Sequence, residues 1–180
     1  YNYFLYTNYA IGERWNSHIS SGHIKTDFTY IPLPGLKFYY GLKAGKYFFN
    51  PGNHNGEQIG LKNTVSPVNS GEIVLYMGAE HEINNWLQLN YGIRGVNWSN
   101  YGNAFVVNYS RYQFESFTEY EAHESYYSNN QLEPRISMSF RFDEFSSLKV
   151  SYNRTLQHIN LINNSVSPFN TLEVWLPSGP

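Results

Sequence analysis

The chain of 180 residues has no cysteine, few charges and no long apolar run. Without cysteine it can form no disulfide framework, thiolate zinc site or cysteine nucleophile. Its 12 basic and 14 acidic residues give no basic excess of the kind that nucleic-acid modules carry, so we expect no nucleic-acid partner. The longest apolar run, Ile73–Met77, is far shorter than the ~20 residues of a spanning helix. These absences exclude disulfide-rich scaffolds and helical membrane proteins.

What the chain has instead is aromatic residues, 18% of the total, and apolar residues at every second position of six segments. The alternating apolar residues lie in Ile24–Tyr30, Leu36–Ala44, Ile73–Ala79, Leu87–Ile93, Ile136–Phe142 and Leu148–Tyr152. The intervening positions hold mostly Lys, Asn, Ser, Arg and Gly. Period two is typical of strands with one apolar face, whereas a helix would bring residues three and four apart together. The sequence therefore predicts an all-β fold.

Short and long connections alternate between these segments. The short ones are 31–35, 84–86 and 143–147, and the long ones are 49–72, 97–131 and 155 to the end. Compact soluble domains rarely carry loops beyond ~15 residues. Outer-membrane barrels alternate tight periplasmic turns with long outer loops. The alternation therefore favours an antiparallel up-and-down transmembrane β-barrel.

An uncharged face on every strand needs a cover, which is either a second sheet or lipid. Segments 36–47 and 132–142 reach the ~9–11 residues that a tilted strand needs to cross a bilayer. Aromatic residues near the segment ends suit the girdles found at membrane interfaces. These are Tyr30, Tyr47, Phe48, Trp86, Trp98, Phe142 and Tyr152. We therefore expect the apolar face to contact lipid.

In hydrocarbon an open sheet edge leaves unpaired backbone groups, so the sheet must close. Six strands are clear, and residues 1–11 and 172–175 would make eight. The last residues, 175–180, resemble a loop more than a closing strand. We therefore expect residues 1–180 to be part of one outer-membrane β-barrel domain, a partial barrel of about 6–8 strands.

Four stretches of the last third carry a resemblance to a known family. They are LEPRISMSFRF from Leu132, SSLKVSYNRTLQHI from Ser146, and the pair Asn163-Asn-Ser and Val174-Trp-Leu-Pro-Ser. Together they resemble the barrel of TonB-dependent outer-membrane receptors, in the group with a carboxypeptidase-regulatory-like N-terminal domain. Residues 24–32 and 90–94 agree with the same barrel more loosely.

The resemblance implies a 22-stranded barrel, an N-terminal plug and a short box that contacts TonB. The plug and the C-terminal strands are not in this sequence, which would supply about a third of the barrel. The implied function is import of a nutrient across the outer membrane of a Gram-negative bacterium. The implied partners are outer-membrane lipid, the TonB energising complex through the missing plug region, and a surface lipoprotein.

Two sets of residues are candidates for contacts with a solute. The first set faces the expected lumen and could guide an anionic solute or hold the plug, or it could simply solvate the inner wall: Lys25, Asp27, Lys37, Lys43, Asn90, Arg94, Arg135, Arg141 and Lys149. The second set lies in the expected long loop and could stack on a sugar or grip a peptide, or it could pack within the loop: Trp98, Tyr101, Tyr109 and Tyr112.

No metal, cofactor or catalytic site is expected. His81 lies between Glu80 and Glu82, but adjacent residues of a strand face opposite ways and cannot converge on one ion. The nucleophile motif Gly-x-Ser-x-Gly is absent, and no Ser, His and acidic trio is marked as converging. We therefore expect a protein that is not an enzyme.

Two alternatives remain open. Aromatic and amide residues on long loops also suit a soluble carbohydrate-binding β-sandwich, which predicts a dry interface between two sheets. A self-contained eight-stranded outer-membrane barrel, structural or lipid-modifying, requires the first and last strands to pair.

Overall fold

The computed structural model describes residues 2–8, 13–55, 66–163 and 173–179, and every regular element in them is a β-strand. The strands are β1 (Asn2–Asn8), β2 (Glu13–Leu33), β3 (Leu36–Asn55), β4 (Val68–Asn84), β5 (Leu87–Tyr101), β6 (Ala104–Ser110), β7 (Gln113–Tyr120), β8 (Ser125–Arg141), β9 (Ser147–Asn153), β10 (Ile159–Asn163) and β11 (Glu173–Pro177). No helix among the described residues is long and apolar enough to cross a membrane.

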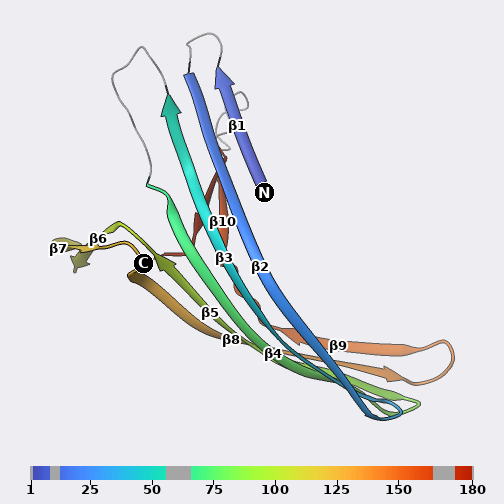
Figure 1. The fold of residues 1–180 in the computed structure, drawn as a ribbon. Coiled ribbons are helices and arrows are strands. Elements are labelled where there is room, and N and C mark those ends of the chain that lie inside the picture. Colours follow the sequence, from blue (N-terminus) through green and yellow to red (C-terminus); the bar gives the residue numbers. More distant parts are fainter. Residues whose placement is uncertain (1, 9–12, 56–65, 164–172, 180) are drawn as a thin grey trace.

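Seven strands form one antiparallel sheet in the order β1-β2-β3-β4-β5-β8-β9. Its strands are long and curved, and its short turns lie together at the lower right of Figure 1. The β2–β3 turn is only Pro34 and Gly35, and Gly35 has a φ of 81°, a left-handed conformation that favours glycine. In the described part of the chain the edge strands β1 and β9 do not pair, so the sheet is open.

Two hairpins leave this sheet at its other end. β6 and β7 pair only with each other and project to the left in Figure 1, so that β5 and β8 become neighbours in the sheet. β10 and β11 form the second hairpin, and β11 packs against β2, β3 and β4. We call it the C-terminal hairpin.

The register separates the side chains of the sheet into two faces. One row across the strands is apolar: Phe38, Ala79, Tyr91, Ile136 and Tyr152. The next row is polar: Lys37, Glu80, Asn90, Ser137 and Ser151. Side chains of directly opposite residues point the same way, so each row lies on one side of the sheet and successive rows lie on alternate sides. We call the two sides the apolar face and the polar face.

The apolar face is uncovered in the part of the chain that the structure describes. Ile24 is 77% exposed, Leu75 63% and Met77 62%, although all three lie in the middle of long, paired strands. Soluble proteins rarely expose a continuous apolar surface of this kind.

The hydrophobic core lies on the polar face, at the end away from the short turns. Its buried residues are Ile19, Tyr47, Phe49 and Trp98, and Ile159 and Trp175 of the C-terminal hairpin pack against them. Dense packing therefore occurs where the hairpin covers the sheet, and not on the apolar face.

The predicted all-β, antiparallel fold is confirmed, and the six predicted segments lie in β2, β3, β4, β5, β8 and β9. The strands are longer than predicted: β2 has 21 residues, and β3 continues to Asn55, inside the segment 49–72 that was expected to be a loop. The expected long loop 97–131 contains the end of β5, the β6–β7 hairpin and the start of β8. Polar strands lack the apolar alternation that sequence patterns detect, and their pairing is stabilised by a neighbouring strand.

The two additional predicted strands have different outcomes. β1 extends the sheet as expected, whereas β11, in the region 172–175 and beyond, pairs with β10 and not with the sheet. Two residues assigned to aromatic girdles, Tyr47 and Trp98, are buried on the polar face instead.

Candidate functional site

A network of charged side chains lies on the polar face next to the hydrophobic core, with which it shares Tyr47. Glu72 of β4 is at its centre: its carboxylate is 2.6 Å from Lys43 Nζ and 3.1 Å from Arg94 Nη2, and it accepts a 2.8 Å hydrogen bond from the Tyr47 hydroxyl. Arg94 continues the network, since its Nη1 is 2.8 Å from Glu133 Oε2. We call these five residues the carboxylate network.

Glu133 connects this network to the segment that leads into the C-terminal hairpin. Its side chain is fully buried, and its second oxygen accepts a 3.0 Å hydrogen bond from the Leu156 backbone N–H. A buried carboxylate is costly unless it is paired and hydrogen-bonded, and here both oxygens have donors. The network therefore fixes the path of the chain after β9 as well as joining β3, β4, β5 and β8.

A second contact with the hairpin segment is aromatic. The His158 ring stacks on Trp98, with 5.2 Å between centroids and 7° between planes. Burial lowers the pKa of His158, and this outweighs the nearby carboxylates of Glu72 and Glu133, which raise it. Its buried Nε2 has no hydrogen-bond partner among the described residues. The neutral imidazole is therefore the form that this stack favours.

The end of the hairpin is held by Asn100 of β5. Its Nδ2 donates a 2.7 Å hydrogen bond to the Ser178 carbonyl, while its Oδ1 accepts from Ser70 Oγ and Trp98 Nε1. Ser178 N–H also donates to the His158 carbonyl, which closes the two ends of the hairpin segment on each other. The hairpin is thus anchored on the polar face at both ends.

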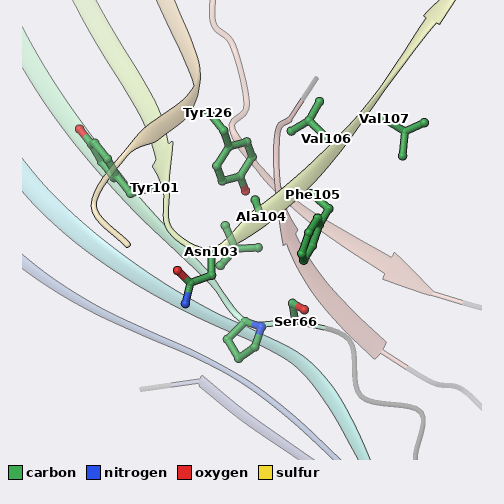
Figure 2. Close-up of a pocket in the computed structure, with 10 residues that line it drawn as sticks. Ser66, Tyr101, Asn103, Ala104, Phe105, Val106, Val107 and Tyr126 are labelled. Carbon is green, nitrogen blue, oxygen red and sulfur yellow. The ribbon is translucent and has the colours of Figure 1, made fainter. Parts of the chain in front are cut away.

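A cavity of about 540 Å³ lies at the base of the β6–β7 hairpin. Figure 2 shows Asn103, Phe105 and Tyr126 around it, with Ser66 below and Tyr101 to one side. Burial raises the pKa of Tyr126. The lining is uncharged, so this cavity suits a neutral group better than an ion.

The nine residues predicted to face the lumen share one side of the sheet. The register places all of them on the polar face: Lys25, Asp27, Lys37, Lys43, Asn90, Arg94, Arg135, Arg141 and Lys149. Several are paired, since Lys25 lies 2.9 Å from Asp27 and Lys37 lies 3.3 Å from Glu80.

The four aromatic residues proposed to contact a solute are not brought together. Trp98 is 1% exposed and packs in the core between Tyr47 and His158. Tyr101 lines the cavity at the base of the β6–β7 hairpin. Tyr109 and Tyr112 lie at the exposed tip of that hairpin. Only Tyr101 therefore borders a cavity.

The sequence interpretation missed Glu72, Glu133 and His158. Glu72 precedes the apolar face of β4 by one residue, and Glu133 lies just before the predicted face of β8. Extending the alternation by a few positions would have placed both carboxylates on the polar face opposite Lys43 and Arg94. No sequence signal indicates that His158 folds back onto Trp98.

The described residues contain no group of three or more His, Asp or Glu side chains that could hold a metal ion. Comparison of the chain with family models, with curated proteins and with solved structures finds no match. The function is therefore inferred from the geometry and the chemistry of the two faces.

Proposed function

We propose that the chain forms part of the wall of an outer-membrane β-barrel, in a TonB-dependent receptor that imports a nutrient into a Gram-negative bacterium. The observation that supports this most is the uncovered apolar face of β2–β5, β8 and β9, which includes Leu75 and Met77. Lipid is the cover that such a face requires, because a spanning strand places apolar side chains outward and polar ones inward.

The length of the apolar band agrees with this proposal. On β3 the apolar positions run from Leu36 to Ala44, a span of nine residues. A tilted strand needs ~9–11 residues to cross a bilayer, so the two lengths agree. Beyond the band the same face becomes polar: Asn97 Nδ2 donates to Asn130 Oδ1 at 2.7 Å, and Ser99 Oγ donates to Ser128 Oγ at 3.2 Å. Such ladders suit strands that extend into water.

The open edges of the sheet support a larger closed structure. An unpaired edge in hydrocarbon leaves several backbone groups without partners, so β1 and β9 would need further strands beside them. In this arrangement the short turns face the periplasm, and the two hairpins lie on the outer side.

A β-sandwich receives less support. It needs a second sheet over the apolar face, whereas the C-terminal hairpin packs on the polar face. An eight-stranded barrel needs β1 to pair with the last strand of the sheet, and β1 and β9 are not paired in the described part of the chain. No specific observation favours either alternative.

Cell fractionation of the full-length gene product tests the membrane location. We expect the protein in the outer-membrane fraction, soluble only with detergent, and migrating differently on gels before and after boiling. A protein that stays soluble and monomeric without detergent would overturn the proposal. The importer assignment is tested separately: growth on the transported nutrient should require both this gene and TonB, and import without TonB would contradict it.

A further inference from the structure

A cavity of about 300 Å³ lies on the sheet beside the carboxylate network, on the side toward the short turns. The polar and charged side chains that line it come from five neighbouring strands: Lys25, Tyr39, Lys43, Tyr76, Arg94 and Arg135. Four of these six are cations, and no carboxylate among the described residues lines the cavity. We propose that this cavity is a binding site for a small solute that carries two or more negatively charged oxygens, on carboxylate or phosphate groups.

Glu72 and Glu133, the carboxylates that pair with Lys43 and Arg94, are less exposed than these two cations. Glu133 is fully buried and Glu72 is 8% exposed, whereas the side chains of Arg94 and Lys43 are 25% and 27% exposed. Lys43 and Arg94 line the cavity, whereas their two carboxylate partners do not. The surface that a solute meets is positive, even though each ion pair is close to neutral.

Arg135 adds a charge that no carboxylate balances. It lies on β8 directly opposite Gly92, is exposed, and has no ion pair among the described residues. Lys25 at the other side of the cavity is paired with Asp27, but both side chains are more than half exposed and such a pair is weak in water. A solute anion can therefore engage Arg135 fully and Lys25 at little cost.

The chemistry of these groups selects the ligand class. A guanidinium group binds a carboxylate or a phosphate through two parallel hydrogen bonds, and an ammonium group adds a point charge. The volume is at the lower end for ligand pockets, so a small solute fits better than a polymer. The two arginines and two lysines on opposite sides of the cavity favour a solute with more than one charge.

This inference rests on the proposed function, because an aqueous passage along the polar face is what would bring a solute to the site. It also goes further, since it assigns a charge to a solute that passes through the barrel. The cavity at the base of the β6–β7 hairpin would not provide such a preference, because its lining is uncharged.

The test is isothermal titration calorimetry on the full-length protein in detergent at low salt, with citrate and inorganic phosphate as separate probes and sorbitol as a neutral control. We expect at least one anion to bind, sorbitol not to bind, and Arg135→Gln to weaken the binding at least tenfold. Arg141→Gln is the matched control, because Arg141 lies on the same strand and face but outside the cavity. It should change the affinity by less than twofold.

The comparison of citrate with phosphate identifies the oxyanion. The absence of binding by both anions, or equal weakening by the two substitutions, would overturn the site. The proposal would also be overturned if the anions bind only after another part of the protein's own chain is removed, because that part would then occupy the cavity. Failure of the anion site in a protein that fractionates with the outer membrane leaves the proposed function standing. Anion binding by a detergent-free soluble protein would overturn the proposed function and keep the site.

Discussion

The two faces of the sheet are built by the same strands and have opposite environments. On the apolar face Leu75 and Met77 are more than half exposed, and on the polar face Glu133 and Trp98 are almost completely buried. The C-terminal hairpin packs on the polar face against the buried Tyr47, Phe49 and Trp98, and no described element covers the apolar face. Among the described residues, another part of the chain therefore covers the polar face but not the apolar face.

The largest expected effect comes from placing a charge on the apolar face. In Leu75→Arg, an arginine near the middle of the band should cost roughly 2–4 kcal/mol if lipid surrounds it. The matched variant Ser137→Arg, on the exposed polar face of β8, should stay within about 0.5 kcal/mol. The measurement is denaturant unfolding in lipid vesicles, together with the amount assembled in the outer membrane. If both arginine variants were equally stable, the proposed difference in environment between the two faces would be contradicted.

The next effect separates buried from exposed ion pairs on the polar face. Glu133→Gln removes the buried charge that Arg94 contacts, so we expect the free energy of unfolding to fall by about 2 kcal/mol. Glu80→Gln should cost less than about 1 kcal/mol, since the Lys37–Glu80 pair is more than 40% exposed on both sides. Unfolding midpoints of the two variants in the same lipid give the comparison. A larger loss in the Glu80 variant would contradict the account of the network.

Substitution of a glycine on each face gives a smaller effect. The Tyr39 ring lies directly over Gly78, so a methyl group there would displace the ring, at a cost of about 1 kcal/mol. Gly22, on the apolar side of β2, has open space around the position of a methyl group, and Gly22→Ala should be neutral within about 0.5 kcal/mol. Stability of the two alanine variants measured side by side tests whether tyrosines pack against the backbone on the polar face. A neutral Gly78→Ala would show that they do not.

The smallest effect is a dependence of hairpin docking on pH. Because burial lowers the pKa of His158, the undocked segment binds the proton more readily than the docked one. Docking should therefore be fully stable above the ordinary histidine pKa of about 6.5 and weaken as the pH falls below it. Hydrogen exchange of residues 156–160 at pH 7.5 and 5.5 measures this, with His158→Phe as a control that keeps an aromatic ring on Trp98. Identical pH responses of the two proteins would contradict the assignment.

The faces of the sheet could be predicted from the sequence, and the hairpins could not. Leu36–Ala44 and Ile73–Ala79 each carry a local alternation that depends only on neighbours two apart, and their register follows from matching apolar rows. The tail of β5 around Asn97 and Ser99 has no such signal, because its side chains bond to Asn130 and Ser128, some 30 residues away.

The candidate site shows the same division. The alternation of apolar and polar residues along β3 and β5 predicts that Lys43 and Arg94 face the same side of the sheet. Their partners Glu72 and Glu133 lie one and three residues before the alternating stretches Ile73–Ala79 and Ile136–Phe142. The Trp98–His158 stack joins residues 60 apart through a reversal of the chain after β9. Contacts made by folding back of the chain have no periodicity, so sequence patterns do not contain them.

The central claim is that lipid, and not protein, covers the apolar face. The described chain has no cysteine, so single cysteines can be placed at Leu75 and Met77 on that face and at Ser137 and Ser151 on the other. We expect a lipid-dissolved nitroxide to quench probes at the first two positions, and a charged aqueous thiol reagent to label only the last two. Aqueous labelling of all four positions, with no quenching from lipid, would contradict the account.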